Sequence, residues 1–202
     1  MRLQHWAMTL LIGTLLGACG GEQTTTPHQP APSLIPQTYA VSDCGGFLAA
    51  KAAPIATPVP AAGYCDAEVL RWTYDKTSGK LAFSNDRVNL NCCGERKVQL
   101  SENNGTYVIH ETDAPESIIT AQGPSEARCG CMCVFDLAVE AESIPGGMIT
   151  VQLVRDVTDS NQPARTLFTG SIDLSAGSGS GSVVIDSSPV GLDASERCPM
   201  MP

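Results

Sequence analysis

The residues of this chain best suited to chemistry are cysteines, and five of them lie in two clusters. Cys92 and Cys93 are adjacent, whereas Cys129, Cys131 and Cys133 occupy alternate positions. Thiolates bind soft metals such as Cu(I) and Zn²⁺, and in an oxidising compartment thiols form disulfides. The clusters therefore offer two chemistries, a soft-metal site or a framework of disulfide bridges.

The second cluster opens the stretch Arg128–Glu142, which alternates in polarity. Residues of one parity in this stretch are cysteine or apolar, namely Cys129, Cys131, Cys133, Phe135, Leu137, Val139 and Ala141. Alternation over this length predicts a half-buried β-strand. We therefore expect the three cysteines to lie on the core face of one extended strand.

Strand geometry favours disulfides over a metal site. Alternate residues of a strand lie about 6.5–7 Å apart, whereas a tetrahedral zinc ion brings its sulfur ligands within about 4 Å of one another. The strand would have to bend at Gly130 to bind a metal, and the sequence contains no Cys-x-x-Cys spacing. A copper or zinc site with Cys129, Cys131 and Cys133 as ligands is therefore the alternative, with Cys92 and Cys93 as further donors.

Eight cysteines remain once Cys19, in the N-terminal leader, is set aside, and their even number predicts up to four disulfides. They are Cys44, Cys65, Cys92, Cys93, Cys129, Cys131, Cys133 and Cys198. Alternate residues of one strand are too far apart to bridge each other, and adjacent ones point to opposite faces. We expect three bridges to join the cysteine strand to three other parts of the chain. A bridge between Cys44 and Cys65 across the loop Ala53–Gly63 fits this scheme, and the connectivity stays open.

The N-terminal segment has the pattern of an export signal. Arg2 precedes the apolar run Ala7–Leu16, which is too short to span a membrane. The run ends in Leu16-Gly17-Ala18-Cys19, which resembles the lipobox of bacterial lipoproteins. The resemblance implies that residues 1–18 are a signal peptide and that Cys19 carries diacylglycerol and an acyl chain such as palmitate. It also implies attachment to the membrane of the bacterial cell envelope through this lipid. By the family's sorting rule Gly20 directs the chain to the outer membrane, on its periplasmic or its surface face.

The rest of the chain divides into two segments. Residues 19–37 comprise the lipidated cysteine and a Pro/Thr-rich tether, and residues 38–202 form a single cysteine-rich β domain. Alternating segments such as Glu68–Tyr74 and Met148–Val157, separated by turn residues such as Asn104-Gly105, predict about eight to ten short strands. The fold expected from them is all-β, an antiparallel sandwich of the Ig-like or jelly-roll-like kind. Thr112–Ala127 is expected to be a polar connection.

Charge and motifs limit the functions that the chain can have. The net charge is −9 without a compensating basic cluster, which excludes nucleic acid as a partner. His110 is the one histidine beyond the leader and tether, and no nucleophile elbow accompanies it. We therefore expect neither an enzyme nor a cofactor, and an enzyme built around His110 is the least favoured hypothesis. The predicted function is a binding or structural role in the envelope, with an unidentified protein or small-molecule ligand. The alternative is a soft-metal lipoprotein that uses the five clustered cysteines.

Overall fold

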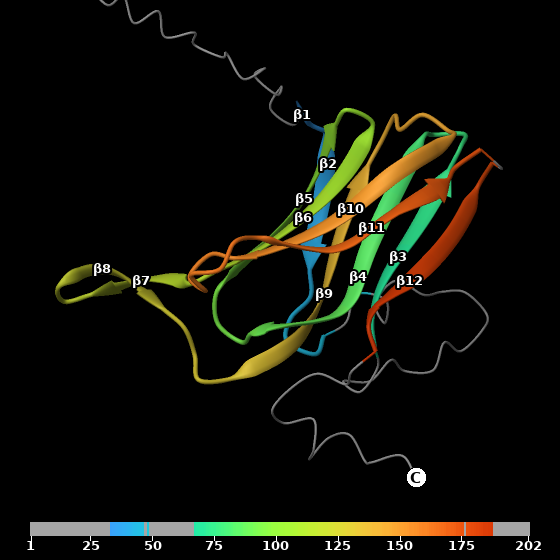
Figure 1. Ribbon diagram of the computed structural model, residues 1–202. Coiled ribbons are helices and arrows are strands. Elements are labelled where there is room, and N and C mark those ends of the chain that lie inside the picture. The colour runs from blue at the N-terminus through green and yellow to red at the C-terminus, as the bar shows by residue number, and fades with distance from the viewer. Residues whose placement is uncertain (1–32, 47, 49–66, 176, 188–202) are drawn as a thin grey trace, which may run out of the picture. The chain divides into compact units, whose positions relative to one another are not determined.

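Twelve β-strands make up most of the described part of the chain, which in this computed structural model comprises residues 33–46, 48, 67–175 and 177–187 (Figure 1). One five-stranded sheet, sheet A, consists in spatial order of β1 (Ser33–Leu34), β5 (Glu95–Asn103), β6 (Thr106–Ala114), β10 (Met148–Val157) and β11 (Arg165–Asp173). The other, sheet B, consists of β12 (Gly179–Asp186), β3 (Glu68–Asp75), β4 (Lys80–Asn91), β9 (Met132–Ala141) and β2 (Gln37–Val41). No helix within the described ranges is long and apolar enough to cross a membrane.

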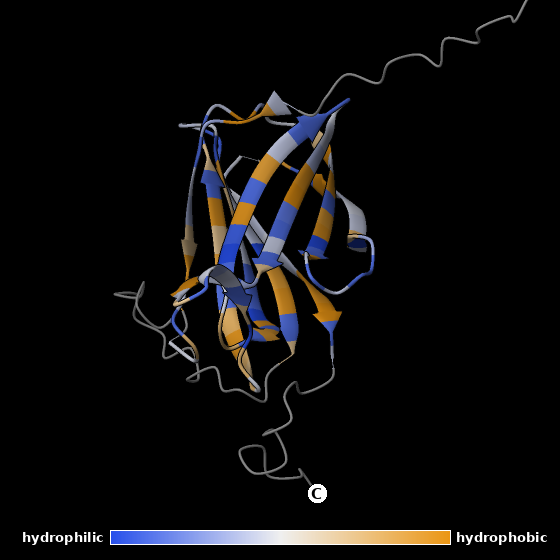
Figure 2. Cartoon of the chain, turned by 90° about the vertical axis from the view of Figure 1, so that its left-hand side faces the viewer, coloured by the Kyte–Doolittle hydropathy of each residue, from blue (hydrophilic) through white to orange (hydrophobic). Residues whose placement is uncertain are grey.

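The two sheets bury one shared core, which confirms the predicted all-β sandwich. Orange and blue alternate along the strands in Figure 2, because successive side chains of a strand point to opposite faces. Sheet B contributes side chains such as Leu70, Phe83 and Leu137, and sheet A contributes side chains such as Leu100 and Ile109. Burying a side chain of this size contributes about 1.5–3 kcal/mol.

One strand pairing departs from the predicted antiparallel arrangement. β10 pairs with β6 in parallel, with Val151 beside Tyr107, whereas the other pairings among the described strands are antiparallel. The chain leaves sheet A after β6, passes through β9 of sheet B, and returns to sheet A as β10. The return through the opposite sheet gives β10 the same direction as β6.

A hairpin occupies the segment expected to be a polar connection. β7 (Glu116–Thr120) pairs with β8 (Gly123–Ala127), and the hairpin projects from the sandwich in Figure 1. Its apolar residue Ile119 is 81% exposed. The segment expected to be a polar connection therefore contains a strand pair that was not predicted. Pairing between the two short arms satisfies the backbone there, although neither arm alternates in polarity.

Strand pairing also begins earlier than the boundary expected at residue 38. Ser33 pairs with Glu102 in β5, and Gln37 pairs with Ala141 in β9. The Gln37 side chain accepts a hydrogen bond from the Leu100 backbone N–H, which ties the entering chain to sheet A. The predicted signal peptide, the predicted lipidation site Cys19 and most of the predicted tether lie outside the described residues.

The predicted cysteine strand is shorter than its alternation indicates. β9 begins at Met132 instead of Arg128, and the expected parity holds from Cys133 to Ala141. Cys133 is 5% exposed, whereas Cys129 is half-buried and Cys131 is exposed. The expectation that all three cysteines face the core was therefore wrong for the first two. These two residues precede the strand and are bonded to the end of β4.

A polar cluster joins the two sheets inside the sandwich. Arg155 of sheet A contacts Glu111 of the same sheet (Nη2–Oε2 2.7 Å) and Glu68 of sheet B (Nη2–Oε1 2.6 Å). Asn85 Nδ2 donates to both carboxylates, at 2.9 Å to Glu68 and 2.8 Å to Glu111. Two buried carboxylates thus share one guanidinium, and burial raises the pKa of Glu111 above its ordinary value.

The raised pKa of Glu111 predicts an unusual dependence of stability on pH. The folded chain holds this proton more tightly than the unfolded chain, so the stabilisation from Glu111 is complete below pH 4.5 and decreases as the pH rises through the raised pKa. We expect the unfolding free energy of the wild type, minus that of Glu111→Gln, to fall as the pH rises above 4.5 through the raised pKa of Glu111. Urea unfolding at a series of pH values measures this difference.

Asp173 provides a control with the opposite sign. Hydrogen bonds from Ser175 lower the pKa of Asp173, so its contribution is lost as the pH falls instead of as it rises. For Asp173→Asn, the unfolding free energy of the wild type minus that of the variant should rise with pH. If the same difference for Glu111→Gln stays constant or also rises with pH, the assignment to Glu111 is contradicted.

A second buried ion pair lies within sheet B. β4 has a bulge between Asn85 and Val88, where Arg87 adopts a positive φ of 68°. Arg87 Nη1 lies 2.6 Å from Asp136 Oδ1 of β9, and their side chains are 3% and 0% exposed. Asp136 also accepts hydrogen bonds from the backbone N–H groups of Arg87 (3.1 Å) and Leu48 (2.9 Å). The bulge thus aims a cation at a carboxylate that the alternation alone would place on the polar face.

Candidate functional site at the cysteine-bridged end

Three disulfides form among the described residues. Cys44 bonds to Cys133, Cys92 to Cys131 and Cys93 to Cys129, with Cα–Cα distances of 5.7, 5.6 and 5.3 Å. These distances lie in the usual range for disulfides. The prediction that neither alternate nor adjacent cysteines bridge each other is confirmed. Cys65 and Cys198 lie outside the described residues.

The connectivity corrects two expectations. Cys44 bonds to Cys133 and not to Cys65. The bridges from Cys129, Cys131 and Cys133 also reach two other parts of the chain instead of three, because two of them end at Cys92-Cys93. The register explains this result. Asn91 pairs with Met132 at the end of the β4–β9 ladder. Cys92 and Cys93, which follow β4, therefore lie beside the residues just before β9.

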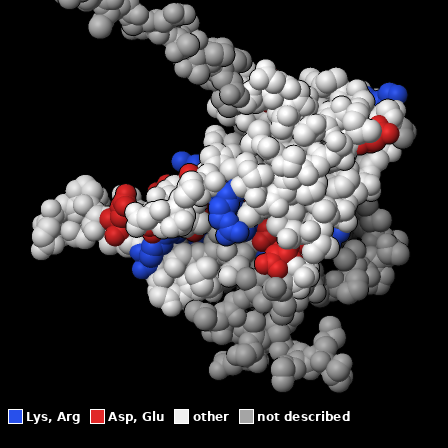
Figure 3. Space-filling model, viewed as in Figure 1, with Lys and Arg blue, Asp and Glu red and all other residues white. Residues whose placement is uncertain are grey.

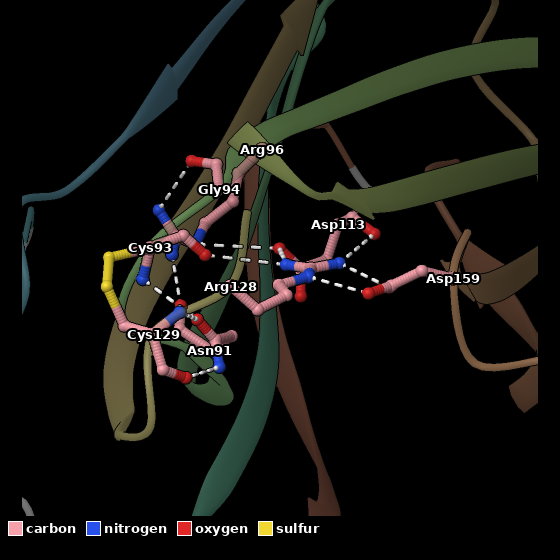
Figure 4. A network of polar contacts seen from close by, with 8 residues as sticks. All are labelled: Asn91, Cys93, Gly94, Arg96, Asp113, Arg128, Cys129 and Asp159. Atoms are coloured by element: carbon pink, nitrogen blue, oxygen red, sulfur yellow. Dashed lines mark hydrogen bonds and ion pairs between the residues drawn. A yellow bond between two sulfur atoms is a disulfide. The ribbon is translucent and has the colours of Figure 1, made fainter. Parts of the chain in front are cut away.

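The side chain of Asn91 clamps the two segments that carry the double bridge (Figure 4). Its Oδ1 accepts hydrogen bonds from the backbone N–H groups of Cys93 (3.0 Å) and Cys129 (3.2 Å), and its Nδ2 donates to the Cys129 carbonyl at 2.8 Å. The Cys92 N–H donates to the Cys131 carbonyl at 3.1 Å. Three of these hydrogen bonds join the two segments in addition to the two disulfides, and the bond from Cys93 to Asn91 lies within the first segment.

Two arginines surround the turn after the cysteine pair (Figure 4). Arg128 contacts Asp113 (Nη1–Oδ1 2.9 Å) and Asp159 (Nη2–Oδ1 2.6 Å), and it donates to the Cys93 carbonyl at 3.4 Å. The hydrogen bond with Asp159 raises the pKa of Arg128 and lowers the pKa of Asp159. Arg96 lies 3.8 Å from the centroid of the Phe135 ring, and its Nη1 donates to the Gly94 carbonyl at 3.3 Å. The turn is thus fixed by charged hydrogen bonds on both sides.

A cleft of about 280 Å³, lined by polar and apolar residues, opens beside the bridged segments. Its lining includes the polar side chains Asn89, Asn91, Asp113, Arg128 and Asp159, with Met132 at the start of β9. The buried Oδ1 atom of Asn89 has no hydrogen-bond partner within the described structure. A buried acceptor of this kind is costly unless a water or ligand donates to it. The cleft therefore has the character of a binding site for a hydrogen-bond donor.

The five clustered cysteines do not form one thiolate site in this structure. The sulfur atoms of Cys92, Cys129 and Cys131 lie within 4.8 Å of one another, but each belongs to a disulfide. Cys133 is bonded to Cys44, next to the core. Metal coordination needs thiolates, so any soft-metal site here requires reduction of the double bridge.

His110 lies on the outer face of sheet A, opposite in parity to the buried Ile109. It is in register with Gln99 of β5 and Val154 of β10, neither of which is a nucleophile.

On the face shown in Figure 3, the described basic side chains lie singly and mostly beside acidic ones. Comparisons with protein-family models, curated proteins and solved structures find no match to this chain. Its role is therefore inferred from its own residues.

Proposed function

We propose that the chain is a lipid-anchored, disulfide-stabilised β domain of the bacterial cell envelope, which binds a ligand at the cleft beside its double bridge. The main support is the set of three disulfides, because such bonds persist in oxidising compartments and are rare in the cytosol. The lipobox-like Leu16-Gly17-Ala18-Cys19 supports the lipid anchor, and Gly20 supports the outer membrane as destination. The role is binding or structural and not enzymatic.

The polar side chains of the cleft would bind a polar group of the ligand. The carboxylates of Asp113 and Asp159 are already paired with Arg128, whereas Asn89 Oδ1 keeps an unfilled acceptor position. A group that donates hydrogen bonds, such as the amide or ammonium of a small molecule or protein side chain, would fill this position. The net charge of −9 disfavours nucleic acid and other polyanions as ligands.

The lipid anchor is tested by replacing the cysteine that would carry it. In bacteria fed labelled palmitate, we expect the wild type to take up the label and remain with the membranes, since several acyl chains anchor firmly. Cys19→Ala should lose the label and leave the membrane fraction. Cys131→Ser serves as the matched control and should keep the label, because its sulfur is in a disulfide. Label on both cysteine variants would contradict lipidation at Cys19.

Native mass spectrometry of the same envelope-purified protein tests the binding role. We expect a bound organic mass that Asn89→Leu loses, because leucine fills the acceptor position without accepting a hydrogen bond. An unchanged bound mass would contradict binding at the cleft.

Soft-metal binding is a second candidate, favoured by the three sulfur atoms within 4.8 Å. Several free thiols with near-stoichiometric copper or zinc would establish it, and the absence of both would remove it.

A further inference from the structure

The two bridges at the end of β4 differ from the third in their surroundings. Besides its bonded partner Cys93, the sulfur of Cys129 has those of Cys92 and Cys131 within 4.8 Å. Thiol–disulfide exchange proceeds by attack of a thiolate on a disulfide sulfur, so a third sulfur nearby is what an internal exchange requires. Opening the first bridge would therefore place a thiolate beside the second.

The solvent exposure of one sulfur and the identity of the leaving thiol favour the Cys92–Cys131 bridge as the first disulfide that an external thiolate attacks. Cys131 is exposed, and attack on its sulfur releases Cys92, which is half-buried. Attack on the exposed Cys44 would instead release Cys133, which is 5% exposed and packed in the core. Burial in apolar surroundings raises the pKa of a thiol, and a leaving thiol of higher pKa departs more slowly. The Cys44–Cys133 bridge should therefore resist exchange.

Hydrogen bonds hold the bridged segments together even without the disulfides. The Asn91 side chain binds the backbone of both Cys93 and Cys129, and the Cys92 N–H donates to the Cys131 carbonyl. Arg128 joins the same region to Asp113 and Asp159. The four sulfur atoms should therefore stay close together after reduction. The two disulfides therefore contribute less to holding these segments together than two disulfides without such hydrogen bonds would.

We propose that Cys92, Cys93, Cys129 and Cys131 form a disulfide relay that exchanges with an external dithiol. One thiolate of the dithiol attacks Cys131 Sγ, the Cys92–Cys131 bond breaks, and Cys92 leaves as a thiolate. The second thiol of the dithiol attacks its own sulfur in the mixed disulfide, which oxidises the dithiol and releases Cys131. The two protons that the dithiol loses are taken up by the released thiolates.

The second step moves the opening inward. The Cys92 thiolate attacks Cys129 Sγ, the Cys92–Cys129 bond forms, the Cys93–Cys129 bond breaks, and Cys93 takes the proton. Overall, two electrons pass from one dithiol to the chain, which ends with one bond, Cys92–Cys129, and two thiols, at Cys93 and Cys131. This activity depends neither on the lipid anchor nor on a ligand in the cleft.

Partial reduction of the full mature chain tests the relay. Thiols that are free beforehand are blocked, one equivalent of dithiothreitol is added, and new thiols are trapped by alkylation after an acid quench. Peptides are then mapped without reduction. We expect label on Cys93 and Cys131, a Cys92–Cys129 peptide, and an intact Cys44–Cys133 bridge that opens at least about tenfold more slowly.

Two variants separate the relay from simple exposure. In Cys92→Ser/Cys131→Ser the entry bridge is absent, and reduction of Cys93–Cys129 should slow by about tenfold because both its residues are half-buried. In Asn91→Ala, Cys131 should still be attacked, but the yield of the Cys92–Cys129 peptide should fall.

Three results would overturn the relay. Label confined to Cys92 and Cys131, without a Cys92–Cys129 peptide, would show that no internal exchange occurs. Simultaneous label on all six bridged cysteines would show opening by global unfolding. Equal rates at Cys93 in the double variant and the parent would show direct attack on the inner bridge.

Discussion

Cys133→Ser should lower the free energy of unfolding by about 4–5 kcal/mol, the largest effect expected of breaking one of the three described bridges. The Cys44–Cys133 bridge joins residues 89 positions apart, the longest separation among the three described bridges. A long closed loop restricts the unfolded chain most, so its loss is the most costly. Urea unfolding under non-reducing conditions measures the loss.

Cys131→Ser is the matched control. It removes a bridge whose neighbour, Cys93–Cys129, still closes almost the same loop, with separations of 39 and 36 residues. The constraint that is lost with the Cys92–Cys131 bridge covers only a few residues, so the free energy of unfolding should fall by about 2 kcal/mol or less. Equal losses in the two variants would show that loop length does not decide the stabilisation.

Asp136→Ala should destabilise the fold by about 3–5 kcal/mol, the usual effect of breaking a buried ion pair. Asp136 is 0% exposed and faces the buried Arg87 guanidinium at 2.6 Å. The substitution also removes the acceptor of the partly buried Leu48 N–H and of the buried Arg87 N–H. Denaturant unfolding with the disulfides intact gives this value.

Glu140→Ala, on the same strand, is the control for that substitution. Glu140 pairs with Lys80 at 2.6 Å, but both side chains are more than a third exposed. Exposed pairs contribute about 0–1 kcal/mol, so Glu140→Ala should change stability little. If Glu140→Ala lowers the free energy of unfolding as much as Asp136→Ala does, the loss of a negative charge from β9 accounts for the effect, and the burial of Asp136 does not.

The core of this fold is predictable from local alternation, and the cysteine-bridged end is not. The parity from Cys133 to Ala141 decides which side chains face the core, because a strand has a period of two. Disulfide connectivity depends on which strands become neighbours, and β4 meets β9 across about forty residues of intervening chain. Strand geometry could exclude pairs such as Cys92–Cys93, but it could not choose among the remaining pairings.

The polar groups around the site carried no signal in the sequence for a different reason. Asn91 ends a strand, as asparagine commonly does, and its role as a clamp depends on Cys129 reaching it from another segment. Asp136 lies on the polar parity of β9, yet it is buried because Arg87, at the bulge, and Leu48 contact it there. Tertiary contacts overrode the local pattern at both positions.

The distant strand pairings of the sandwich bear on the order in which the chain can fold. β2, near the start of the domain, pairs with β9, and β3 pairs with the last strand, β12. A chain that emerges from its N-terminus therefore leaves β2 without its partner until β9 appears, and leaves one edge of β3 unpaired until β12 appears. Folding dominated by such non-local pairs takes about milliseconds to seconds. Disulfide formation and reshuffling take about seconds to hours. A chain that is oxidised before its distant strands have paired would form bonds between wrong partners, so a shuffling catalyst would shorten maturation more than a faster oxidant would.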